Sequence, residues 1–112
     1  MSLWFPIKDE SSLRELVRGD NLEPIAILKH SDRCSISYMA MSRLEKEPDD
    51  RLKYYLLNVI EQRSLSNLLE ELTGTQHESP QLFLFNKGNL ILNKSHMSIR
   101  PAVLSQALDD VG

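Results

Sequence analysis

The 112-residue chain alternates between short, mostly apolar runs and longer segments in which apolar residues recur every three or four positions. Recurrence at that spacing places the apolar side chains on one face of a helix, whereas a short β-branched apolar run is typical of a buried strand. The pattern predicts helices over residues 11–19, 35–47, 64–74 and 98–108, and strands over residues 24–30, 53–61, 81–86 and 89–94. The predicted order is therefore helix, strand, helix, strand, helix, strand, strand, helix.

Capping and turn residues delimit these elements. Ser12 and Glu15 have the spacing of a capping box at the start of the first helix. Ser98 is the predicted N-cap of the last helix, with Pro101 in its first turn, where a missing N–H costs nothing. The sequence Asn-Lys-Gly-Asn at residues 86–89 has the chemistry of a hairpin turn.

The order of elements predicts a fold. The strand–helix–strand unit at residues 25–59 should be parallel with a right-handed crossover, and the last two strands should be antiparallel. These units combine into a small mixed four-stranded sheet flanked by helices, an α/β sandwich of thioredoxin type. A length of 112 residues fits one such domain spanning residues 1–112.

Composition narrows the range of functions. The chain has 13 Lys and Arg against 16 Asp and Glu, a net charge of −3 that argues against nucleic acid as a partner. No apolar stretch approaches the roughly 20 residues of a membrane helix, and the N-terminal residues do not resemble a signal peptide. A single cysteine permits no internal disulfide, so we expect a reducing, cytoplasmic location and no membrane partner.

That cysteine, Cys34, follows the first buried strand and precedes a helix. In open α/β sheets, chemistry gathers at this edge, and the free N–H groups and dipole of the helix start favour a thiolate over a thiol. Arg33 adds positive charge nearby, and Ser37 could donate a hydrogen bond to the thiolate from the first helical turn. A buried, inert cysteine is the alternative. The polar residues 31–35 favour the reactive thiol.

Two further features lie near the expected site. Pro80 opens the first strand of the hairpin, where a proline is tolerated whether its peptide bond is cis or trans. His30, His77 and His96 could each approach the Cys34 edge of the sheet. Their spacing matches no metal-binding motif, so we predict hydrogen-bonded histidines and no metal site.

Three stretches carry a resemblance to a known family: "LKHSDRCSIS" around Cys34, "VIEQRSLSN" at residues 59–67, and "GTQHESPQLFLFNKGNL" followed by "KSH". In order and spacing they resemble the monothiol bacilliredoxins, thioredoxin-like proteins of bacteria that use bacillithiol. The resemblance implies that Cys34 is the redox thiol and that Ser37 stands in place of a resolving cysteine. It also implies that Pro80 is a cis-proline beside Cys34, with the Ser79 backbone facing the substrate. Where the family usually has Cys-Pro-Ile-Ser, this chain has Ser35 in place of the proline.

The resemblance also implies an activity: removal of bacillithiol from S-bacillithiolated client proteins through a mixed disulfide on Cys34. Bacillithiol would be a cosubstrate, no cofactor would be tightly bound, and a low-molecular-weight thiol or a partner protein would release Cys34. We expect a monomer or a weak dimer. The predicted catalytic residues are Cys34, Ser37 and Arg33, and the predicted substrate-binding residues are Ser35, Ile36, His77, Ser79 and Pro80.

Other functions remain open from the sequence. Ser31-x-x-Cys34 is superficially similar to the Thr-x-x-Cys of peroxiredoxins, but Ile27 stands where those proteins have a proline. Some glutaredoxins with a C-x-x-S motif carry iron–sulfur clusters, although their sequence pattern differs. A non-enzymatic thioredoxin-like adaptor, or a stress-response binding module in which Cys34 is incidental, is the main alternative.

Overall fold

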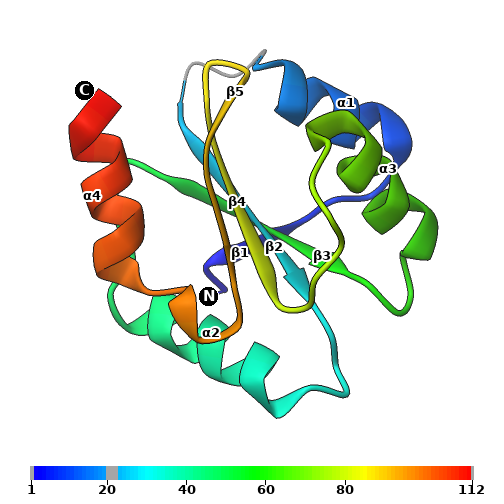
Figure 1. Ribbon diagram of the computed structural model, residues 1–112, viewed down its shortest axis with the longest axis horizontal. Helices are drawn as coiled ribbons and strands as arrows, with labels where there is room; N and C mark the ends of the chain where they lie inside the picture. The colour runs from blue at the N-terminus through cyan, green and yellow to red at the C-terminus, as the bar shows by residue number, and fades with distance from the viewer. Residues whose placement is uncertain (1, 20–22, 112) are drawn as a thin grey trace.

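The computed structural model describes residues 2–19 and 23–111, and their strands form one mixed sheet in the order β1-β3-β2-β4-β5. Helices cover both faces of this sheet (Figure 1). The elements are β1 (Trp4–Pro6), α1 (Glu10–Arg18), β2 (Ile25–His30), α2 (Ser35–Lys46), β3 (Lys53–Asn58), α3 (Arg63–Thr73), β4 (Gln81–Asn86), β5 (Asn89–Ser95), the 3₁₀ helix η1 (His96–Ser98) and α4 (Pro101–Val111). No helix of these residues combines the length and the apolar character needed to cross a membrane.

The sheet has five strands, so the prediction of four was wrong. The missed strand is β1, which pairs in parallel with β3, Trp4 opposite Tyr54. Three residues are too few to show an alternating pattern, and Pro6 is tolerated because β1 is an edge strand. Burial of Trp4, whose ring meets that of Tyr54 edge-on at 5.6 Å between centroids, holds β1 on the sheet.

The predicted strand directions are confirmed. β2 and β3 are parallel, whereas β4 pairs antiparallel with both β2 and β5. The hairpin turns at Lys87 and Gly88, which both have positive φ, 52° and 82°. Gly19, which ends α1, lies against this turn so closely that a Cβ on it would be 2.2 Å from the Gly88 nitrogen. Only glycine fits there.

The side chains of β2 alternate between two hydrophobic cores, one on each face of the sheet. Ala26 and Leu28 pack in the core under α2 and α4. Ile25 and Ile27 pack in the core under α1 and α3. The next two residues of the strand, Lys29 and His30, are also buried, which makes this end of β2 unusual.

Two helix starts differ from the prediction. Asp9 caps α1, because its carboxylate accepts the Ser12 N–H at 2.8 Å, and the helix begins at Glu10. Ser98 lies in η1, and α4 begins only at Pro101. The residue before a proline is disfavoured in helical conformation, which explains why the helix does not extend back to Ser98.

Candidate functional site

Cys34 lies between β2 and α2, as the sequence predicts. It is the N-cap residue of α2 with extended backbone, φ −117°. Its carbonyl accepts the N–H groups of Ser37 at 3.1 Å and Tyr38 at 3.3 Å. The residue is half-buried and belongs to neither hydrophobic core. The sulfur therefore sits at the positive end of the helix and not among aliphatic side chains.

Ser37 is fully buried, and its hydroxyl does not make the predicted hydrogen bond to the Cys34 sulfur. The oxygen accepts the Ser31 N–H at 3.1 Å and lies 2.5 Å from Nδ1 of His30. No hydrogen bond joins it to the Cys34 sulfur in the described part of the chain. The sequence correctly predicted that Ser37 lies in the first turn of α2. It gave no sign that the buried His30 ring would bind the Ser37 hydroxyl.

His30, the last residue of β2, is buried beside the loop that leads to Cys34. Its Nε2 lies 3.1 Å from the Asp32 carboxylate, and its ring packs edge-on against Tyr38. Burial lowers the pKa of His30 below 6.5, although the Asp32 carboxylate opposes the shift. The ring is therefore neutral near pH 7.

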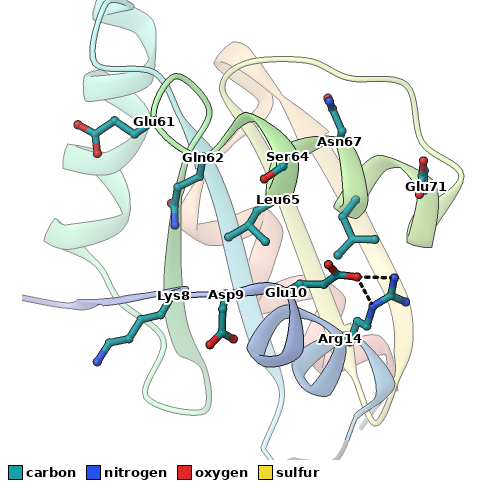
Figure 2. A pocket seen from close by; sticks show the side chains of 11 residues that line it. Lys8, Asp9, Glu10, Arg14, Glu61, Gln62, Ser64, Leu65, Asn67 and Glu71 are labelled. Carbon is teal, nitrogen blue, oxygen red and sulfur yellow. Dashed lines mark hydrogen bonds and ion pairs between the residues drawn. The ribbon is translucent and has the colours of Figure 1, made fainter.

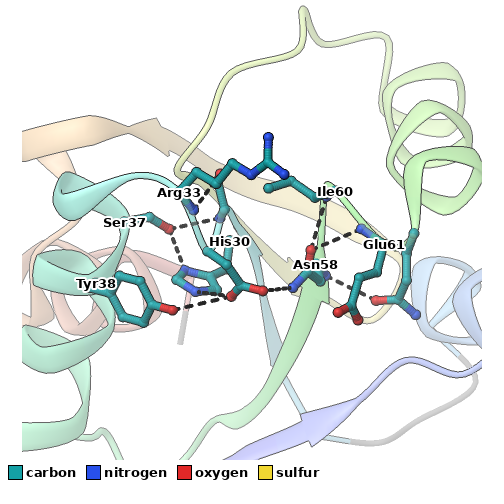
Figure 3. A network of polar contacts seen from close by, with 10 residues as sticks. His30, Arg33, Ser37, Tyr38, Asn58, Ile60 and Glu61 are labelled. Carbon is teal, nitrogen blue, oxygen red and sulfur yellow. Dashed lines mark hydrogen bonds and ion pairs between the residues drawn. The ribbon is translucent and has the colours of Figure 1, made fainter.

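Asp32 carries the contacts on to the next strand. Its second carboxylate oxygen accepts a hydrogen bond from the Asn58 side chain at 2.8 Å. That bond is the main reason why the pKa of Asp32 is lowered, and His30 and Tyr38 add to it. Figure 3 shows His30, Ser37 and Asn58, at the ends of β2 and β3 and the start of α2, drawn together around one loop. We call His30, Asp32, Ser37 and Asn58 the His30 network.

Asn58 in turn organises the loop between β3 and α3. Its carbonyl oxygen accepts the N–H groups of Ile60 and Glu61, and its own N–H donates to the Gln62 side chain at 3.0 Å. Gln62 then donates to the Ile7 carbonyl, just after β1. Contacts therefore run from the loop before Cys34 across three strands of the sheet.

The other predicted residues around Cys34 face outward. Arg33 and Ser35 are exposed and Ile36 is half-buried. The Arg33 side chain extends away from the His30 ring (Figure 3), and its backbone N–H donates to the Ser31 hydroxyl at 3.3 Å. These residues are open to an incoming molecule.

The second part of the site is the loop of residues 75–80, which we call the Pro80 loop. The Ser79–Pro80 peptide bond is cis, as the resemblance implies. β2 pairs with β4 through Lys29 opposite Gln81, so extending the register by one residue places Pro80 beside His30. Pro80 is buried, and its carbonyl accepts the His96 N–H at 3.1 Å.

Ser79 is half-buried and has unused hydrogen-bonding groups. Its hydroxyl is buried and has no partner among the described residues. Its backbone N–H and carbonyl likewise make no hydrogen bond within the described ranges. A free backbone segment at the end of a strand can pair with an extended chain.

Two buried polar side chains of the sheet, Gln81 and Lys29, make hydrogen bonds to the Pro80 loop. Gln81 accepts the Glu78 N–H at 3.1 Å and donates to the Gln76 carbonyl at 3.1 Å. Lys29, which is fully buried, donates from Nζ to Nδ1 of the exposed His77 at 3.1 Å. Burial lowers the pKa of Lys29, and it also lowers that of His77, with a further contribution from the Lys29 charge.

The three histidines therefore do not converge. His30 belongs to the His30 network, His77 contacts Lys29, and His96 lies 3.3 Å from the Glu78 carboxylate. No group of three or more His, Cys, Asp or Glu side chains among residues 2–19 and 23–111 could hold a metal ion.

Sequence reasoning missed Lys29, Asp32, Asn58 and Gln81. Two signals were available. Asp32 and Asn58 follow or end neighbouring parallel strands, whose carboxyl ends meet at one edge. Lys29 is a charge inside the apolar run of residues 25–30, where a strand covered on both faces leaves it no route to water.

A separate hollow lies between α1 and α3 (Figure 2). Its walls carry acidic, basic and amide side chains, among them Glu10 and Arg14, which pair with each other at 2.9 Å. None of the predicted site residues lines it. We therefore place the functional site at Cys34 and the Pro80 loop.

Comparison with known proteins identifies the family and the fold. Residues 5–104 match the family model described as Monothiol bacilliredoxin BrxC. A solved structure described as a proposed oxidoreductase with a thioredoxin fold is 30% identical, with a TM-score of 0.84 and coverage of 95% of this chain and 94% of that chain.

Thioredoxins share the fold at lower identity. The protein from Trypanosoma brucei brucei has a TM-score of 0.77 at 11% identity and covers 96% of this chain and 89% of its own. Thioredoxin from Malassezia sympodialis has a TM-score of 0.70 at 20% identity, with coverage of 94% and 87%. These two similarities establish the thioredoxin fold and nothing finer.

Proposed function

The chain belongs to the monothiol bacilliredoxin family, and from this premise we propose that it removes bacillithiol from S-bacillithiolated proteins by thiol–disulfide exchange at Cys34. The observation that carries the proposal is the position of Cys34, half-buried at the N-terminus of α2 with its sulfur outside both cores. No capping hydrogen bond ties the Cys34 side chain to α2, which leaves the sulfur available to an incoming disulfide. The thiolate is the attacking species in exchange.

The proposed reaction conserves atoms and electrons. The Cys34 thiolate attacks the bacillithiol sulfur of the client's mixed disulfide, a new bond forms between Cys34 and bacillithiol, and the client thiolate leaves. The chain has no second cysteine, so a second thiol must attack the bacillithiol sulfur and release Cys34. That thiol is bacillithiol itself or the cysteine of a partner protein. Overall, the client cysteine is reduced, and the bacillithiol that it carried forms a disulfide with one external thiol.

The Pro80 loop supplies a surface for the client. The free backbone groups of Ser79 lie just before the start of β4, and extension of the β2–β4 register brings them toward residues 31–34. An extended client segment pairing with Ser79 would bring its modified cysteine toward Cys34. The proposed contacts for the substrate are Arg33, Ser35 and Ile36 beside Cys34, and His77 in the Pro80 loop.

The proposed setting follows from the same chemistry. A thiol that depends on external thiols for turnover needs a reducing compartment, so we place the protein in the cytoplasm. A single catalytic cysteine needs no second subunit, which is consistent with action as a monomer or weak dimer. The reducing equivalents come from thiols, so no tightly bound cofactor is needed.

The test uses a purified model protein carrying bacillithiol on one cysteine. Wild type should remove the adduct and acquire the mass of bacillithiol on Cys34, both visible by intact-protein mass spectrometry. Cys34→Ser should leave the adduct in place. Ser42→Ala, at an exposed α2 residue eight positions beyond Cys34, serves as the folded control. Equal rates for wild type and Cys34→Ser would contradict the proposal and favour a non-enzymatic adaptor.

A further inference from the structure

The His30 network has a single consistent set of hydrogen-bond directions. The Ser31 N–H donates to the Ser37 oxygen, so the Ser37 hydroxyl is free to donate to Nδ1 of His30. A neutral ring that accepts at Nδ1 carries its proton on Nε2, which donates to Asp32. Asn58 donates to the second oxygen of Asp32. Each donor in this series therefore meets an acceptor.

These bonds fix the loop of residues 31–34, here the Cys34 loop, from both ends. Ser37, on the first turn of α2, holds the loop at Ser31, while Asp32 in the middle of the loop is held by His30 from β2 and Asn58 from β3. The Cys34 N–H also donates to the Ser31 carbonyl at 3.2 Å. The backbone that carries Cys34 is thus tied to α2, β2 and β3, and the buried His30 ring joins two of the side chains involved, Ser37 and Asp32.

We propose that His30 is a positioning residue for Cys34: by joining Ser37 to Asp32, it sets the direction from which the sulfur meets an incoming disulfide. The inference rests on the proposed thiol–disulfide exchange and assigns a role to a residue that never contacts the substrate. Buried polar networks with all members satisfied are rigid, and loss of one member frees the others.

Two reactions of the same sulfur separate positioning from simple integrity of the fold. Exchange with a protein disulfide requires the attacking, central and leaving sulfurs to be nearly in line while the client also occupies the Pro80 loop. Alkylation by iodoacetamide needs only an accessible thiolate, because the small reagent can approach from any open direction. Misplacement of the Cys34 loop should therefore slow exchange much more than alkylation.

The experiment divides the role of the ring between its two nitrogens. In His30→Asn the side-chain amide can take the place of Nδ1 and keep Ser37, but it cannot reach Asp32. In His30→Gln the longer amide can reach Asp32 but leaves Ser37. Ser42→Ala is again the control, because this exposed α2 residue lies outside the His30 network and the Pro80 loop.

We expect His30→Asn and His30→Gln each to slow removal of bacillithiol from the model protein by about tenfold while iodoacetamide alkylation changes by less than about twofold. Ser42→Ala should match wild type in both reactions. Asp32→Asn breaks the same series of bonds from the solvent side, keeps the buried ring, and should show the same selective loss. It tests the inference even if the His30 variants do not fold.

Unchanged exchange in folded variants, or an equal loss of exchange and alkylation, would overturn the positioning role while leaving the proposed function intact. Failure of wild type to exchange at all would overturn the proposed function, and the positioning role with it. The wild-type measurement, made first, distinguishes the two failures.

Discussion

Lys29 and His30 are successive residues of β2 that point to opposite faces of the sheet, and both are buried polar side chains near the site. His30 contacts Ser37, Asp32 and the ring of Tyr38. In the described part of the chain, the Lys29 ammonium has one hydrogen-bond acceptor, His77, and lies 5.6 Å from the centre of the Phe83 ring. One side chain is embedded in a network, and the other holds a single exposed partner.

The difference shows that burial of a polar group does not by itself reveal its importance. Removal of His30 leaves a buried hydroxyl without an acceptor, which costs free energy. Removal of Lys29 relieves the desolvation of an ammonium group and leaves only the ring of His77, which water can reach. His30 should therefore stabilise the fold, whereas Lys29 should not.

The largest effect expected is that of His30→Leu. We predict a loss of about 3 kcal/mol in the free energy of unfolding, because the Ser37 hydroxyl becomes unsatisfied and the ring contact with Tyr38 is lost. Urea denaturation followed by circular dichroism measures it. A loss below about 1 kcal/mol would show that the network contributes little to stability.

The second prediction concerns which residue holds the Pro80 loop. Gln81→Met keeps the length of the side chain but removes its bonds to Glu78, Gln76 and Asn93. We expect a loss of about 2 kcal/mol in the free energy of unfolding, since the freed backbone groups can be partly rehydrated. Hydrogen exchange of the Glu78 amide, measured by NMR, should accelerate. Unchanged exchange would instead assign the loop's stability to Lys29 and His77.

The third prediction has the opposite sign. Lys29→Met should raise the free energy of unfolding by about 1 kcal/mol, because a buried ammonium with one acceptor is replaced by an apolar side chain of similar length. Lys53→Met, at a half-buried lysine of β3, is the control and should change stability less. Destabilisation by Lys29→Met would mean that the Lys29–His77 hydrogen bond stabilises the fold by more than burial of the ammonium group costs.

The smallest effect is on the pH dependence of stability. The pKa values of His30 and His77 are lowered from 6.5 in the folded protein, so below that pH the unfolded chain binds protons that the folded chain resists. The contribution of these two histidines to the free energy of unfolding should be fully present above pH 6.5. It should be lost as the pH falls below that value. Asp32 acts in a lower range, because its pKa is lowered from 3.8.

Urea midpoints at pH 7.5, 6.5 and 5.5 measure this dependence. His30→Asn should flatten it by removing one of these two histidines. Ser42→Ala, which changes no titratable group, should leave it as in wild type. An identical slope in wild type and His30→Asn would assign the dependence to His77.

Much of the fold could be predicted because most of its helices and strands follow from the spacing of apolar residues and from turn residues close together in the sequence. The spacing of Leu13 and Leu16 predicted α1, and the turn at Lys87 and Gly88 predicted the hairpin. β1 could not be predicted, since a strand of three residues depends on pairing with β3, more than 45 residues away. Likewise, the position of Cys34 at a strand–helix junction was readable, but the partner of Ser37 was not.

The sequence by itself determined that there is one thiol and no internal disulfide, because this follows from counting cysteines. It also determined where that thiol lies along the chain, because hydrophobic periodicity is a local property. Only the tertiary structure decided what surrounds the thiol. Residues 30, 37 and 58 come together through the parallel pairing of β2 with β3 and the packing of α2, and hydrogen bonds between such distant residues depend on distances that no local pattern encodes.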